Sequence, residues 1–133
     1  MKKCVMAGLL LALAPVVAAE ENLKVAQDLA ACVPLFQHSE MQLRQAGHER
    51  EADFYEGMSR GAVIASLQAL ENGGYDEGYA QGAIPAWVET NAVVFRLSVA
   101  DEGFFEQEIN RCGALNATQT KLVDQWRKGQ RRG

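Results

Sequence analysis

Two cysteines constrain the fold of this chain more than any other feature, because each lies on the apolar stripe of a predicted helix. Cys32 falls in line with Phe36, and Cys112 falls in line with Ile109. Two stripes that each carry a cysteine are expected to face one core. The sequence therefore predicts a structural Cys32–Cys112 disulfide, which closes a loop of about 80 residues and stabilises the fold by about 4–5 kcal/mol in the chain-entropy description. A redox-active or metal-bound pair is the alternative.

Residues 1–19, MKKCVMAGLLLALAPVVAA, have the layout of a bacterial secretory signal peptide. Two lysines precede an apolar run over residues 6–17, and Val17 and Ala19 stand at positions −3 and −1 before Glu20. We expect cleavage there and a periplasmic location, where the two remaining cysteines pair. An uncleaved N-terminal anchor is the alternative. The mature chain is expected to contain no transmembrane segment, since a membrane helix needs about 20 apolar residues.

Charge and composition narrow the class of protein. Residues 20–133 contain 11 basic and 17 acidic residues, a net charge of −6, which argues against a nucleic-acid partner. The whole chain is 48% hydrophobic, too much for a disordered chain and typical of one globular domain. We therefore expect residues 20–133 to form a single domain, with a basic, frayed tail at 127–133.

Apolar periodicity predicts an all-α fold, a small bundle of about four to five helices in which the disulfide joins the first mature helix to the penultimate one. A helix is expected over 22–46, with a break near Val33 because Pro34 cannot continue it. A second is expected over 48–71, ended by the glycines that follow Asn72.

The second half of the chain is harder to assign. The glycine-rich segment 75–82 is interpreted as a connector that holds a short helix, and 84–100 fits a helix better than a strand. A helix over 101–112 is expected to end at Gly113. Asn116 resembles the N-cap of a last short helix, with Gln119 completing a capping-box variant.

Three sets of residues are candidates for interaction with a partner, which we expect to be another envelope protein. Tyr75, Tyr79 and Trp87 are aromatic residues of the kind enriched at interfaces, although they also suit a lid on a small core. Gly57 and Gly61 begin a row of small residues that suits close helix packing within the chain or, alternatively, a homodimer. The third set is the basic tail, which is either solvated or in contact with an anionic partner: Arg127, Lys128, Arg131 and Arg132.

No catalytic or cofactor motif is recognisable. The carboxylates that open the second helix suit the helix dipole better than acid–base catalysis: Glu49, Glu51, Asp53 and Glu56. Neither His38 nor His48 has a partner at metal-ligand spacing, so we expect no metal and no cofactor; a noncovalent haem between His38 and Met58 is the remaining alternative.

These observations favour a non-enzymatic protein-binding module of the adaptor, inhibitor or immunity type. A periplasmic stress chaperone is the alternative hypothesis, and a cofactor-carrying bundle is a third.

Overall fold

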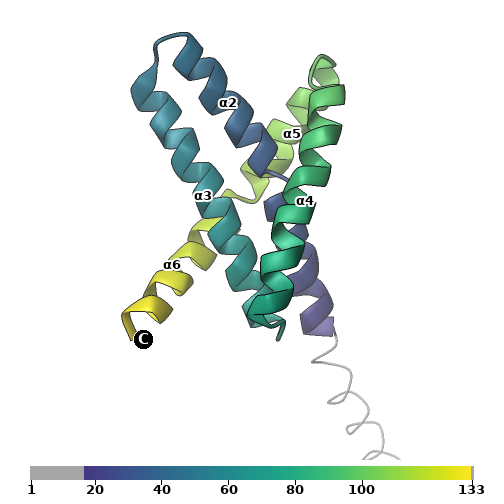
Figure 1. Cartoon of the computed structure of the whole chain (residues 1–133), viewed down its shortest axis with the longest axis vertical. Coiled ribbons are helices and arrows are strands. Elements are labelled where there is room, and N and C mark those ends of the chain that lie inside the picture. Colours follow the sequence, from purple (N-terminus) through teal and green to yellow (C-terminus); the bar gives the residue numbers. More distant parts are fainter. Residues whose placement is uncertain (1–16, 133) are drawn as a thin grey trace, which may run out of the picture.

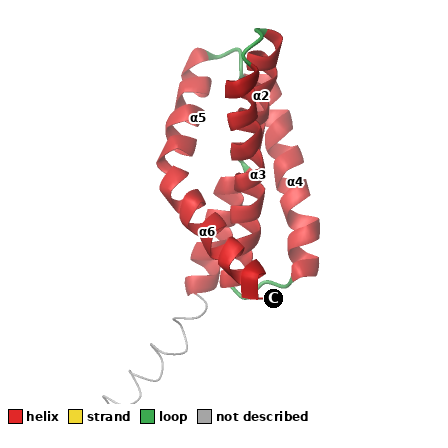
Figure 2. Ribbon diagram, turned by 90° about the vertical axis from the view of Figure 1, so that its left-hand side faces the viewer, coloured by secondary structure: helices red, strands yellow, loops and turns green. Residues whose placement is uncertain are grey.

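The computed structural model describes residues 17–132. Within this range the chain forms a helical segment over residues 17–30 and five further helices, α2 to α6, with no strand (Figures 1 and 2). The predicted all-α bundle is confirmed. The predicted signal peptide lies outside the described residues except for residues 17–19.

The break predicted near Val33 is present. The helical segment stops at residue 30, a turn occupies residues 31–32, and α2 (Val33–Gln45) begins with Pro34 in its first turn. Proline suits this position because the N–H groups of a first helical turn have no acceptor within the helix, so the N–H that proline lacks is not needed there. Gly47 then adopts a φ of +83°, the left-handed conformation that glycine enters without strain, and the chain reverses into the next helix.

α3 (Glu49–Asn72) matches the second predicted helix, but the segment that follows it differs from the prediction. Residues 75–82 are not a connector: α4 (Glu77–Ser98) starts inside that segment and is continuous. The Asp76 side chain accepts a hydrogen bond from the Tyr79 backbone N–H at 2.7 Å and so caps the helix, a signal that outweighs the glycines. The helical interpretation of 84–100 is confirmed, and α4 also contains the exposed Pro85.

Two further boundaries were predicted incorrectly. α5 (Glu102–Ala114), capped at its start by the Asp101 side chain, continues through Gly113 instead of ending there. α6 (Asn116–Arg132) already includes Asn116, and Gln119 forms no capping box. The Gln119 side chain instead donates a hydrogen bond to the Met58 carbonyl of α3 at 3.1 Å. The Gln119 side-chain amide, which the sequence predicts to cap α6, therefore forms a hydrogen bond to another helix instead.

The helices form two arms that diverge from a common base (Figure 1). One arm is the antiparallel pair α2 and α3, and the other contains α4 and α5. The helical segment 17–30 lies in the base, and α6 extends from the centre of the molecule beside the lower half of α3.

The core consists of two adjoining clusters and is rich in small side chains. The lower cluster packs the helical segment 17–30, α3, α4 and α6 around Leu29 and Leu70. The upper cluster surrounds the two cysteines with Phe36 and Phe95. Ser66, the largest fully buried polar side chain, donates its hydroxyl to the Ala26 carbonyl at 2.7 Å, which ties α3 to the helical segment 17–30.

Candidate functional site

The predicted disulfide is formed. Cys32 and Cys112 are bonded, their Cα atoms lie 5.8 Å apart, and both residues are buried. Cys32 occupies the turn before α2, and Cys112 lies near the end of α5. The bond therefore attaches α5 to the point where the N-terminal helix breaks.

Arg111 reinforces this attachment from the neighbouring position. At the break the Cys32 N–H bonds to the Leu29 carbonyl, three residues back, so the Asp28 carbonyl loses its usual helical donor. The Arg111 guanidinium donates to the Asp28 carbonyl at 3.0 Å, and Glu108 holds the same guanidinium at 2.8 Å. An arginine thus satisfies an acceptor that the proline-induced break leaves open.

Apart from this attachment, few side chains of α5 are buried by other helices. Cys112 is its one buried residue, and Ile109, predicted to share the buried stripe, is 47% exposed. That part of the prediction is wrong because no helix among residues 17–132 covers the Ile109 side of α5. Its apolar stripe instead lines an open groove.

The groove runs between the two arms, has a volume of about 400 Å³, and reaches down to the disulfide. We call it the α2–α3–α5 groove. Its walls are mainly apolar and aromatic, with Ser39 and Asn116 as the polar exceptions. The lining residues are Leu35, Phe36 and Ser39 of α2, Phe54, Tyr55 and Met58 of α3, Phe105, Ile109, Cys112 and Gly113 of α5, and Asn116 of α6.

Aromatic rings order the α2–α3 wall. The Phe54 and Tyr55 ring centroids lie 5.3 Å apart at an edge-to-face angle, and Tyr55 lies 6.4 Å from Phe36. Phe54 is 62% exposed although its ring is as large as those in the core. Helical periodicity alone does not select Phe54, because it lies beside the apolar stripe of this helix, which begins with Tyr55 and Met58.

Acidic side chains flank the groove. Glu51 lines its extension along α2 and α3. Glu102 and Glu106 lie one turn before Phe105 and Ile109 on the same face of α5, and both are exposed. Arg50, one turn before Phe54, is the basic residue nearest to this set along the sequence of α3. The groove therefore has an apolar floor with a predominantly negative border.

Three of the four carboxylates predicted at the start of α3, all but Glu51, are gathered around an arginine that the sequence did not point to. Arg44 of α2 forms ion pairs with Glu49 at 2.6 Å, Asp53 at 3.0 Å, and Glu40 and Glu56 each at 3.1 Å. Hydrogen bonds that the Arg44 guanidinium donates, above all to Glu40 and then to Asp53 and Glu49, raise the pKa of Arg44 above its ordinary value. The cluster joins α2 to α3 beside their connecting turn.

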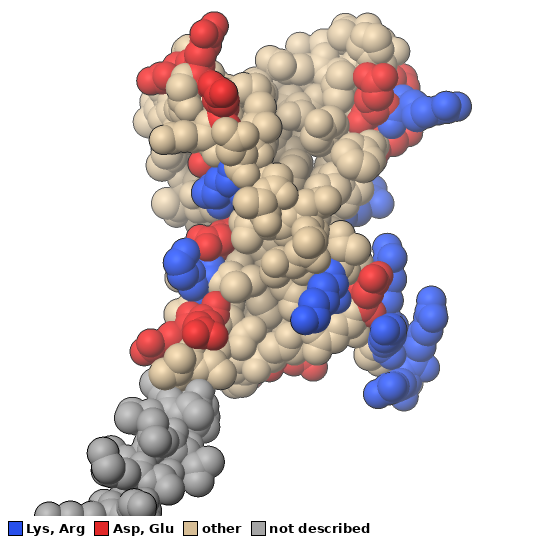
Figure 3. Space-filling model, turned by 180° about the vertical axis from the view of Figure 1, so that it is seen from behind, with Lys and Arg blue, Asp and Glu red and all other residues tan. Residues whose placement is uncertain are grey.

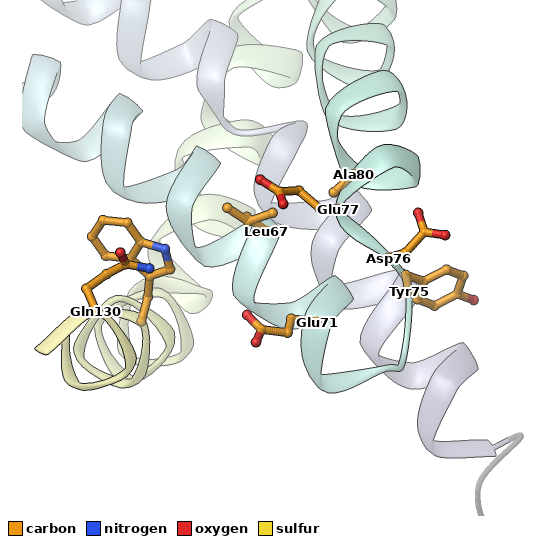
Figure 4. Close-up of a pocket in the computed structure, with 8 residues that line it drawn as sticks. Leu67, Glu71, Tyr75, Asp76, Glu77, Ala80 and Gln130 are labelled. Carbon is orange, nitrogen blue, oxygen red and sulfur yellow. The ribbon is translucent and has the colours of Figure 1, made fainter. Parts of the chain in front are cut away.

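The predicted aromatic set is brought together. Tyr75 and Tyr79 stack with centroids 5.0 Å apart, and Trp87 meets Tyr79 edge-on at 6.4 Å. Tyr75 and Trp87 also pack against the lower core cluster, as the lid interpretation requires. Tyr75 borders a cavity of about 320 Å³ between α6 and the start of α4. Figure 4 shows the Tyr75 ring pointing away from α6, whereas the Glu71 side chain points toward α6.

The small-residue row packs largely within the chain. A methyl group built on Gly61 would lie 2.8 Å from the Gln119 side-chain nitrogen, so the Gln119 side chain of α6 packs closely on α3 there. Ala65 and Ala69, the next two members, are fully buried. Gly57 has nothing within 4 Å of its added methyl group. Three of the four positions are therefore occupied by contacts inside the chain.

The histidines take structural positions. His38 packs edge-on against Phe95 at 5.3 Å and Phe105 at 6.0 Å. His48 precedes α3 and lies 3.8 Å from the Glu51 carboxylate. No cluster of three or more His, Cys, Asp or Glu side chains suited to a metal ion occurs among residues 17–132.

The basic residues predicted as a tail belong to α6, which continues to Arg132. They are exposed, and basic side chains gather at the lower edge of the molecule seen from behind, where α6 ends (Figure 3).

Over the described range, no helix combines the length and apolar character that crossing a membrane requires. Comparisons with protein-family models, with curated proteins and with solved structures found no match to this chain.

Proposed function

We propose that this chain is a periplasmic, non-enzymatic protein-binding module and that the α2–α3–α5 groove is its docking site. The observation that carries the proposal is the exposure of Phe54 and Ile109 on opposite walls of one apolar groove. Large aromatic and aliphatic side chains that converge on a concave surface are typical of protein-recognition sites.

The occupant that fits this groove is an amphipathic helix of a partner protein. The groove is bounded by helices on both sides, and α5, with 13 residues, spans about 20 Å, which corresponds to three to four helical turns of an occupant. An apolar helix face would cover Phe54 and Ile109. Basic residues on the borders of that face would meet Glu51, Glu102 and Glu106.

The disulfide supports this role by fixing the α5 wall. Without a covalent attachment, α5 would depend on Arg111 and on edge contacts such as Phe95 with Phe104, whose centroids lie 5.9 Å apart. A wall held in place before binding avoids part of the ordering cost of association. The predicted export to an oxidising compartment provides the conditions in which this bond persists.

The test uses two fluorescent synthetic peptides with identical leucine faces, one carrying lysine and the other glutamate on its polar face. Fluorescence anisotropy should show tighter binding of the lysine peptide to the purified mature protein. Ile109→Asp, which places a charge in the groove, should weaken that binding by at least about tenfold.

Leu97→Asp is the matched control. Leu97 is 82% exposed on the outer face of α4 and lines none of the cavities described above, and its substitution changes the net charge by the same amount. Equal loss of binding in both variants would show that the loss does not depend on the groove and would refute the groove as the site. Equal affinity for the two peptides would refute the basic partner.

A photo-crosslinking residue in place of Phe54 extends the test to the cell. It should yield a discrete adduct that is lost when Ile109→Asp is combined with it and kept when Leu97→Asp is combined with it. An adduct that survives Ile109→Asp would contradict docking in the groove.

A further inference from the structure

The positive charge of α6 is confined to one side of the helix. Successive helical residues are about 100° apart around the axis, so its five cations fall within one arc of about 140°. We call this arc the α6 basic stripe: Lys121, Arg127, Lys128, Arg131 and Arg132. The other residues in the same arc are Ala117, Thr120 and Asp124, so the arc contains five cations and a single carboxylate.

The opposite side of α6 is used for packing. Gln119 and Leu122 are buried, and Val123 packs against the lower core cluster. Trp126 is half-buried and lines the cavity shared with Leu67. Because the packing face is taken by α3, the basic stripe must point away from the bundle, as the exposure of all five cations shows.

The stripe contrasts with the rest of the described chain. Residues 17–115 contain six basic and sixteen acidic residues, a net charge of −10, whereas α6 has a net charge of +4. The body does not neutralise the stripe: among the described residues its one ion pair joins Arg127 to Asp124 at 3.9 Å. Glu71 and Glu77 line the cavity on the packing side of α6 (Figure 4).

We propose that the α6 basic stripe holds the protein on an anionic lipid surface. The stripe is convex, extends about 16 Å along the helix, and lacks the aromatic anchors that protein recognition uses, so it suits a flat array of phosphate headgroups. It contains no large apolar side chain to insert, and binding is therefore electrostatic and sensitive to salt. Asn116 is the one residue of α6 that lines the groove, and it lies outside the stripe, so a docked protein could still receive its partner.

The test is co-sedimentation of the mature protein with vesicles of phosphatidylcholine that contain about one third phosphatidylglycerol, compared with pure phosphatidylcholine. Wild-type protein should bind the anionic vesicles at low salt and be released at high salt, with no binding to the neutral ones. Neutralising four cations of the stripe (Arg127→Gln, Lys128→Gln, Arg131→Gln, Arg132→Gln) should weaken binding by at least about a hundredfold.

The matched control removes four cations elsewhere and keeps the same net charge: Lys24→Gln, Arg50→Gln, Arg60→Gln and Arg96→Gln. This variant should bind like wild-type protein, and thermal unfolding should show that both variants remain folded. Equal loss in the two variants, binding to neutral vesicles, or no vesicle binding by wild-type protein would overturn the proposal. Self-association that the stripe variant loses, without vesicle binding, would assign the stripe to a second copy of the chain instead.

Discussion

The close approach of α6 to α3 can be measured by comparing two glycines of one helix. Gly57 and Gly61 both lie inside α3, one turn apart, and each loses conformational entropy there. Alanine at either position should stabilise the helix itself by about 1 kcal/mol. Their surroundings differ, because an added methyl group meets nothing at Gly57 but lies 2.8 Å from the Gln119 amide nitrogen at Gly61.

The cost at Gly61 follows from the position of Gln119. Its side chain is buried and donates to the Met58 carbonyl at 3.1 Å, so a methyl group at Gly61 must displace that amide. A buried donor without a partner costs about 1–3 kcal/mol. Gly57→Ala should therefore raise the free energy of unfolding by about 1 kcal/mol, and Gly61→Ala should lower it by about 0–2 kcal/mol.

Urea denaturation followed by circular dichroism measures both values under identical conditions. The decisive quantity is the difference between the two variants, expected to be about 1–3 kcal/mol. A double-mutant cycle isolates the contact: in a Gln119→Ala background, Gly61→Ala should become stabilising. If Gly61→Ala stabilises the unmodified protein as much as Gly57→Ala does, α6 does not pack on α3 as described.

Three further variants test the attachments of the N-terminal helix, each by urea denaturation. The Cys32→Ala/Cys112→Ala protein should lose about 4.5 kcal/mol, from the loop of 80 residues that the bond closes. Arg111→Met keeps the aliphatic stem but removes the donor to the Asp28 carbonyl, and should cost about 1 kcal/mol. Ser66→Ala removes a buried hydrogen bond without leaving a buried donor unpaired, and should also cost about 1 kcal/mol.

A specific result would contradict each of these three predicted stability changes. Reduced wild-type protein should match the double-alanine variant within about 1 kcal/mol, and a much more stable reduced form would mean that the bond contributes little. An Arg111→Met protein as stable as wild type would mean that the hydrogen bond to the Asp28 carbonyl contributes nothing to stability. No change in Ser66→Ala would mean that its hydroxyl is not bonded to the N-terminal helix.

The sequence predicted most of the fold because its strongest signals are local. Pro34 and Gly47 mark boundaries that depend on backbone geometry alone, and the structure places a turn shortly before Pro34 and another at Gly47. The disulfide was predictable because both cysteines lie on apolar stripes. The prediction for segment 75–82 is wrong because the Asp76 cap starts a helix there that the glycines of the segment do not prevent.

The candidate groove was less predictable, because it depends on which apolar residues remain uncovered. Ile109 follows the helical period of a buried residue, and only the divergence of the two arms leaves it exposed. The roles of Gln119 and Arg111 are equally unpredictable, because each side chain donates a hydrogen bond to a carbonyl more than 60 residues away in the sequence. Contacts over such separations have no signature in a local pattern.

The attachment of α5 at the helix break is the claim on which the groove and the bundle both depend, and peptide mapping by mass spectrometry under non-reducing conditions tests it most directly. Protein isolated from the periplasmic fraction should begin at Glu20 and yield one linked pair of peptides that contains Cys32 and Cys112. Two unlinked peptides with free thiols would contradict the account.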